Sequence, residues 1–229
     1  MRYTKLLLTL ALSTLLSACG FETVATESTF AIDSAEQARA AGLSHGEYVA
    51  RLGNCVACHT IENGEPLAGG LKMNVPLLGN IYSTNITPDP ETGIGTYSFT
   101  DFDRSMRLGK TKDGHRMYPA MPYTSYAKMS EQDMQALYDF LMNEVEAVNQ
   151  PNFPAEIPRW KNVRWAMGIW NLLAHDNNPY TTDSSQNDAW NRGAYLVEGL
   201  GHCGACHTPR GLMLQEKGLA SGDDDYLAG

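Results

Sequence analysis

A chain of 229 residues has room for one large domain or two small ones, and its 43% of hydrophobic residues can bury a core. The formal net charge of −9 disfavours nucleic acid and anionic membrane surfaces as electrostatic partners of the chain as a whole. It suits a partner with a basic docking face.

Residues 1–18 predict a signal peptide of the lipoprotein type. Arg2 and Lys5 form a short basic start, and the apolar run over 6–16 is too short to span a membrane as a mature helix. The run ends in the tetrapeptide LSAC, which resembles a lipobox and makes Cys19 the predicted lipidated residue. The alternative is an ordinary signal peptide with a free thiol at Cys19. Removing both cations with the signal would change the formal charge from −9 to −11.

Residues 19–33 predict a flexible tether, because few large apolar side chains occur there. No other hydrophobic run approaches transmembrane length. We therefore expect an exported protein on the periplasmic side of a bacterial membrane, held there by lipid.

The pentapeptide Cys55-Val56-Ala57-Cys58-His59 predicts a covalent haem site. Two cysteines three apart on a helical turn project to the same side, so both thiols can add to vinyl groups of one porphyrin. The histidine that follows can then bind the iron as its proximal ligand. A structural zinc site, a disulfide or a thioredoxin-like pair are the alternatives.

A second copy, Cys203-Gly204-Ala205-Cys206-His207, strengthens the haem interpretation. Zinc ribbons keep their cysteine pairs roughly 15 to 20 residues apart, whereas these pairs are separated by more than a hundred. Four of the five cysteines belong to the two motifs, which leaves Cys19 over for lipid. The residues ahead of both motifs also match if one residue is inserted in the later copy, so the helix that leads to the haem is an internal repeat.

The loop over 81–89 is rich in hydroxyl and amide groups that could donate to haem propionates, with Asn85 as the principal candidate. A plain Asx or Ser/Thr turn is the alternative for the same residues.

A methionine is predicted to fill the sixth position of the first haem iron. Met121 is the first candidate, because Pro119 and Pro122 hold it in a rigid extended loop. Met117 is the second candidate and His115 the third.

Residues 34–150 resemble a cytochrome c domain, and the fold class is mainly α. The pattern predicts helices that start at Asp33 or Ser34 and end at Ala41, and over 46–54, 100–108 and 131–145. The order of these helices around a methionine loop is that of the cytochrome c fold.

Residues 151–186 form a predicted linker with an amphipathic, tryptophan-rich helix. Trp160, Val163, Met167 and Trp170 follow helical spacing. We interpret this stripe as a clasp between two domains; an interfacial or quinone-proximal helix is the alternative.

Residues 187–229 predict a partial second cytochrome c domain, in which Arg210 is a candidate propionate partner. About forty residues bury too little apolar surface to stand alone, and Met213 lies too close to His207 to reach across the ring. We therefore expect the remainder of this domain to follow Gly229.

The runs IYSTNITPDPETGIG, YPAMPYTSY, WKNVRWAMGIW and GAYLVEGLGHCGACHTPRG, over residues 81–95, 118–126, 160–170 and 193–211, resemble the multihaem cytochrome c subunit of bacterial membrane-bound dehydrogenases. Those complexes oxidise alcohols, gluconate, sorbitol or aldehydes. The resemblance implies three cytochrome domains, two haem c in this chain and a third beyond it. It also implies a partner subunit with FAD or PQQ and electron relay to ubiquinone, with no organic substrate bound here. The alternative is a stand-alone, lipid-anchored dihaem carrier.

Overall fold

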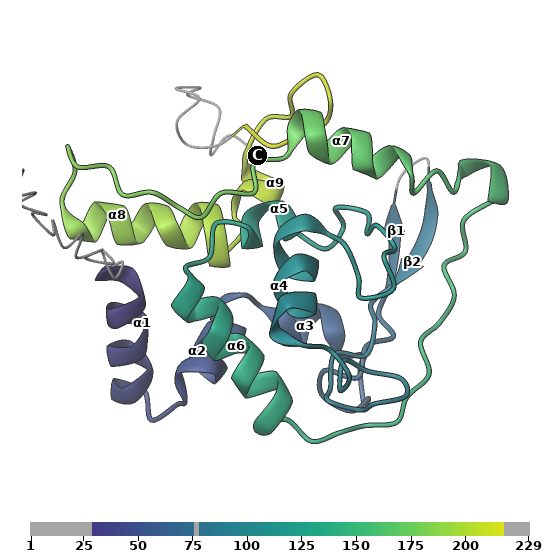
Figure 1. Ribbon diagram of the computed structural model, residues 1–229, viewed down its shortest axis with the longest axis horizontal. Helices are drawn as coiled ribbons and strands as arrows, with labels where there is room; N and C mark the ends of the chain where they lie inside the picture. The colour runs from purple at the N-terminus through teal and green to yellow at the C-terminus, as the bar shows by residue number, and fades with distance from the viewer. Residues whose placement is uncertain (1–28, 76–77, 218–229) are drawn as a thin grey trace, which may run out of the picture.

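The computed structural model describes residues 29–75 and 78–217, which are mainly helical (Figure 1). The predicted signal peptide, Cys19 and the end of the chain lie outside these residues. The α-helices are α1 (Thr29–Ala40), α2 (His45–Leu52), α3 (Cys55–His59), α4 (Phe99–Leu108), α5 (Tyr123–Tyr126), α6 (Glu131–Asn143), α7 (Ala166–Ala174), α8 (Asp188–Tyr195) and α9 (Gly204–His207). A 3₁₀ turn η1 (Arg159–Lys161), a π-helix η2 (Leu196–Leu200) and the strands β1 (Lys72–Val75) and β2 (Gly79–Tyr82) complete the list.

Serine side chains fix where several helices begin. Ser130 accepts a hydrogen bond from the Asp133 backbone N–H and so starts α6 at the predicted position. Ser98 and Asp101 form a capping box, so α4 begins at Phe99, one residue before the predicted start. The start predicted for α1 at Asp33 or Ser34 is wrong, because this helix already begins at Thr29.

The core of the first domain forms where α2 crosses α6. Val49 from α2 meets Leu137 and Leu141 from α6, and all three are almost fully buried. The crossing depends on Gly46, because a Cβ there would lie 2.1 Å from the carbonyl oxygen of Ala136. Glycine therefore lets the two helix backbones approach closely.

The stretch that follows the first motif, rich in glycine and proline, contains a small antiparallel sheet. In it β1 pairs with β2, with Lys72 opposite Tyr82 and Val75 opposite Gly79. Glu156 holds the linker to this hairpin: its carboxylate bonds Lys72 at 2.8 Å and Tyr82 at 2.5 Å. The linker thus closes one side of the first domain (Figure 1).

The helix before the second motif is docked on the first domain. Tyr195, 1% exposed, donates to the buried carboxylate of Asp133 at 2.6 Å and accepts from the Ser130 N–H at 3.1 Å. His45 bonds the same carboxylate at 2.7 Å. A guanidinium nitrogen of Arg192 donates to Ser34 at 2.8 Å. This buried polar network joins α1, α2, α6 and α8.

The predicted one-residue insertion in the repeat is present as a π-helix. In η2 the Gly201 N–H donates to the Leu196 carbonyl at 2.7 Å, and the backbone kinks at Gly199 (φ −101°, ψ −105°). This widened, kinked turn absorbs one extra residue. Gly193, the counterpart of Gly46, differs in surroundings: a Cβ there would meet nothing within 4 Å. Within the described part of the chain, α8 has no crossing helix like α6 on its glycine face.

The tryptophan-rich stripe is not one continuous helix. Pro158 starts the short η1, and α7 begins only at Ala166. Among residues 29–75 and 78–217, no helix combines the length and apolar character needed to cross a membrane.

Candidate haem site

The first motif forms α3, which begins directly after a left-handed residue. Asn54 has φ 53°, and this turn separates α2 from the five-residue helix that contains Cys55 and Cys58. Burial raises the pKa of the Cys55 thiol to about 12, whereas Cys58 is exposed. Neither cysteine is held in a disulfide, so both thiols are available for covalent attachment.

His59 is oriented by a backbone carbonyl. Its Nδ1–H donates to the Thr84 carbonyl oxygen at 2.7 Å. Burial lowers the pKa of the imidazole, and the hydrogen bond opposes this shift only in part. The ring is therefore neutral with its proton on Nδ1, and Nε2 presents its lone pair as a metal ligand would.

A cavity of about 2120 Å³ opens against both cysteine motifs. Cys55, Cys58 and His59 line it from α3, and Cys206 lines it from α9. Its walls include Phe102, Met106, Leu137, Leu141 and Ile94 from the core. The cavity thus combines an apolar lining with thiols and an imidazole, the donor set of a c-type haem.

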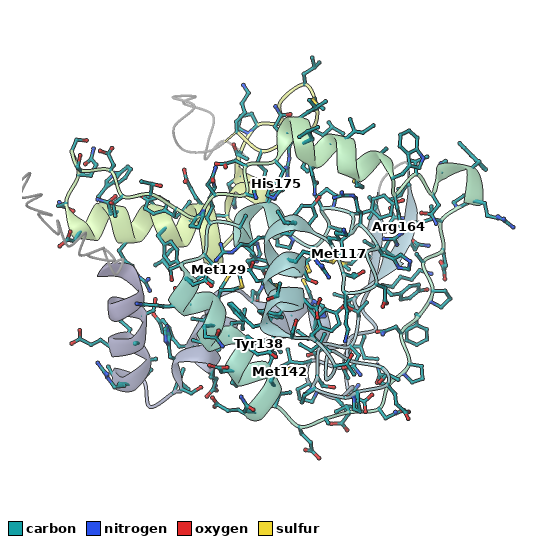
Figure 2. The ribbon with its side chains drawn as sticks, in the orientation of Figure 1. Met117, Met129, Tyr138, Met142, Arg164 and His175 are labelled. Atoms are coloured by element: carbon teal, nitrogen blue, oxygen red, sulfur yellow. The ribbon has the colours of Figure 1, made fainter. Side chains whose placement is uncertain are left out.

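Met121, Met117 and His115 all line this cavity. Met121 is half-buried and packs against the core, whereas His115 is exposed. Figure 2 shows Met117 beside Arg164, which donates to the neighbouring Arg116 carbonyl at 2.8 Å. The sixth-ligand assignment to Met121 stays a prediction.

The hydrogen bonds of Asn85 serve the loop that contains it. Its Nδ2 donates to Thr92 at 3.0 Å and to the Val148 carbonyl at 2.7 Å, while its Oδ1 accepts from the Thr87 N–H at 2.9 Å. Asn85 also lines the cavity. The bonds found here are those of the alternative turn interpretation, and the propionate contact stays a prediction.

The second motif has the same local backbone as the first. His202, φ 39°, precedes it as Asn54 precedes the first, and α9 ends in an extended threonine as α3 does. Cys203, Cys206 and His207 are exposed. Within the described residues, the His207 ring has no hydrogen-bond partner. The second motif thus differs from the first in this part of the chain: a backbone carbonyl orients the imidazole of His59, and no such acceptor orients that of His207.

Arg210 lines the cavity near the second motif. Its guanidinium donates to the Ala205 carbonyl and lies 3.4 Å from the Glu216 carboxylate. A role with a propionate stays a prediction.

Tyr126 joins the two motifs, a role that no local sequence pattern predicted. Its hydroxyl donates to the Gly53 carbonyl at 2.7 Å, two residues before Cys55. Its ring meets the His202 ring edge-on at 5.8 Å between centroids, one residue before Cys203. The YPAMPYTSY run held this tyrosine, but only the fold brings its two partners together.

The fold and the cavity define a cytochrome c domain, and comparison with known families agrees. Residues 44–144 match the family described as Cytochrome c. This part of the chain belongs to that family, which implies covalently bound haem c. The neutral His59, the paired thiols and the apolar cavity fit this group, and they favour haem over zinc or a disulfide as the interpretation of the first motif.

The chain is also similar to named cytochrome subunits. It is 50% identical over 202 residues to the gluconate 2-dehydrogenase cytochrome c subunit of Pantoea cypripedii, covering 87% of this chain and 46% of that protein. It is 48% identical over 201 residues to the cytochrome c subunit of a quinone alcohol dehydrogenase of Gluconacetobacter polyoxogenes, covering 87% and 43%. A dihaem c-type cytochrome of Cereibacter sphaeroides is 37% identical over 180 residues, covering 76% and 60%. The chain therefore spans about half the length of the relatives it matches.

Proposed function

We propose that this chain relays electrons one at a time between a periplasmic dehydrogenase subunit, with FAD or PQQ, and ubiquinone or another carrier of the respiratory chain. The observation that carries the proposal is one cavity that the thiols and imidazole of the first motif line together with Cys206 of the second. Two haem c would lie in this chain, and a lipid at Cys19 would hold it on the membrane. The relatives named as dehydrogenase cytochrome subunits support a dehydrogenase partner.

Haem c would supply the change of redox state, and the residues of the chain would hold and tune it. Cys55 and Cys58 would anchor the porphyrin, with Cys203 and Cys206 in the second site. His59 and His207 would bind iron.

The hydrogen bond from His59 to the Thr84 carbonyl fixes the ring and raises its basicity as a ligand. Met121 would complete the first site and raise its potential. No acid, base or nucleophile of the chain is needed for this function.

A second candidate is a stand-alone, lipid-anchored dihaem carrier. The similarity to the dihaem c-type cytochrome favours it, since that relative is named without a dehydrogenase. The two candidates differ in whether a dehydrogenase must dock on the chain.

Haem stoichiometry and reduction kinetics test the proposal. A pyridine haemochrome assay should give two c-type haems per chain, and Cys203→Ser with Cys206→Ser should give one. Rapid mixing with a reduced gluconate or alcohol dehydrogenase subunit should then reduce the haem, and a ubiquinone analogue should reoxidise it. A small soluble reductant serves as the control, because it shows whether the haem can be reduced without any dehydrogenase subunit.

The outcomes separate the candidates. Reduction by the small reductant but by neither dehydrogenase subunit would favour the carrier. Absence of any c-type haem band would overturn both.

A further inference from the structure

The helix α7 turns its apolar face away from the protein. Trp165, Ile169, Leu172 and Leu173 share one face by helical spacing, and their exposed fractions are 71%, 52%, 82% and 65%. An apolar helical stripe normally faces a core. Here it faces outward along the upper margin of the molecule (Figure 1).

The opposite face of α7 carries Met167, Trp170 and Asn171 and is turned towards the first domain, to which polar side chains bond it. Asn171 donates to the Leu108 carbonyl at 2.8 Å and accepts from the Tyr123 hydroxyl at 2.8 Å. His175 donates to the Arg107 carbonyl at 2.6 Å. These buried contacts fix the rotation of the helix, so the outward stripe is a consequence of the packing.

The predicted clasp is therefore only partly right. Met167 and Trp170 line the cavity, and the Trp170 indole N–H donates to the Met213 carbonyl at 2.7 Å. The other two residues of the predicted stripe, Trp160 and Val163, are 78% and 40% exposed.

The charge around this stripe opposes that of the chain. Residues 157–175 contain Arg159, Lys161 and Arg164 and no carboxylate, in a chain of net charge −9. The carboxylates that flank this range are paired elsewhere, Glu156 with Lys72 and Asp176 with Lys128. Lys161 lies over the Trp160 ring at 4.9 Å, so cation and indole are adjacent. Arg164 instead faces inward over Tyr118 at 4.8 Å. The outer cations thus sit at one end of the apolar stripe.

We propose that this surface, defined by Trp160, Trp165, Ile169, Leu172 and Leu173 with Arg159 and Lys161, docks on an anionic lipid bilayer. Tryptophan favours the headgroup level, leucine and isoleucine enter the acyl boundary, and cations meet anionic headgroups. The local positive charge overrides the repulsion expected of the acidic chain within the Debye length, about 8 Å at physiological salt. The chain would then lie flat on the membrane along α7.

Co-sedimentation with vesicles tests this surface separately from any lipid at Cys19. The haem-loaded chain is exported behind a completely removed signal peptide and contains Cys19→Ser. It should sediment with vesicles of phosphatidylglycerol and phosphatidylcholine, and more weakly with phosphatidylcholine alone or in high salt. Binding needs no electron transfer, so failure here leaves the proposed function standing.

Two pairs of variants probe the two halves of the surface. Trp165→Ser with Leu172→Ser should weaken vesicle binding roughly tenfold or more. Serine gains far less free energy than tryptophan or leucine when its side chain moves from water into the bilayer. Arg159→Glu with Lys161→Glu should remove the preference for anionic vesicles. Trp190→Ser, at an exposed tryptophan on α8 and away from this surface, should leave binding unchanged. Circular dichroism and the haem spectrum check that each variant is folded.

Equal binding to anionic and neutral vesicles by the unmutated chain would overturn the proposal. So would vesicle binding that both variant pairs leave unchanged. If the variants instead weaken co-purification with a dehydrogenase subunit and leave vesicle binding intact, the surface is a protein interface and the lipid proposal is wrong.

Discussion

Replacing Gly46 by alanine should destabilise the first domain. The new Cβ would lie 2.1 Å from the Ala136 carbonyl oxygen and 2.4 Å from the Phe140 Cβ. A normal carbon–oxygen contact is about 3.3 Å, so α6 would have to move by roughly 1 Å. Overpacking of this kind costs about 1–3 kcal/mol, and the better helix propensity of alanine returns up to about 1 kcal/mol. We expect a net loss of about 1 kcal/mol.

Gly193→Ala is the matched control, because this glycine holds the same place in the second copy of the repeat. A Cβ at Gly193 meets nothing within 4 Å, so only the propensity gain, about 0.5–1 kcal/mol, should remain. Guanidinium unfolding, followed by circular dichroism, measures the free energy of unfolding of both variants. An unchanged dependence of this free energy on denaturant concentration shows that the variants unfold in the same way as the unmutated chain. An unchanged or raised midpoint for Gly46→Ala would refute the reasoning. A loss at Gly193 as large as that at Gly46 would reveal a helix covering α8 in the whole protein.

Three further predictions concern ligation, acid stability and membrane attachment. Met121→Ala should keep covalent haem but lose the methionine–iron charge-transfer band, whereas Met117→Ala should keep it; an unchanged Met121→Ala spectrum would reject the ligand assignment. Hydrogen bonds from Lys72 and its neighbours lower the pKa of Glu156 to about 2, so the stability that it contributes is full above about pH 4.5 and is lost towards pH 2. Glu156→Gln should therefore flatten the pH dependence of the unfolding midpoint in that window, and an unaltered profile would contradict this. Cys19→Ala should make the chain extractable from membranes by salt instead of detergent, and a continued need for detergent would argue against the lipid.

Local sequence patterns predicted the parts of the site that are themselves local. The motif at Cys55, the serine cap at Ser130 and the inserted residue in the repeat all depend on neighbours within a few positions. The structure agrees at each of these places, because short-range hydrogen bonds determine them.

Contacts between distant residues could not be predicted in the same way. The carbonyl that orients His59 belongs to Thr84, and no side-chain pattern marks a backbone acceptor. The β1–β2 hairpin was missed because its strands have four residues each in a glycine- and proline-rich stretch. The residues around α7 have helical spacing, but spacing alone does not say which face of the helix turns inward. Met167 and Trp170 line the cavity, whereas Trp165 and Leu172 are exposed. That direction depends on Asn171 and His175 bonding α4 and α5.

The turn η2 has a consequence for how a duplicated unit tolerates an insertion. In a regular α-helix one extra residue would rotate everything that follows it by about 100°. The widened, kinked turn of η2 takes up that residue locally instead. Tyr195, ahead of η2, keeps its anchorage on Asp133. Cys206, behind it, lines the cavity that the first motif also lines. The second copy thus keeps its docking helix on the first domain and its Cys206 at the cavity despite the inserted residue.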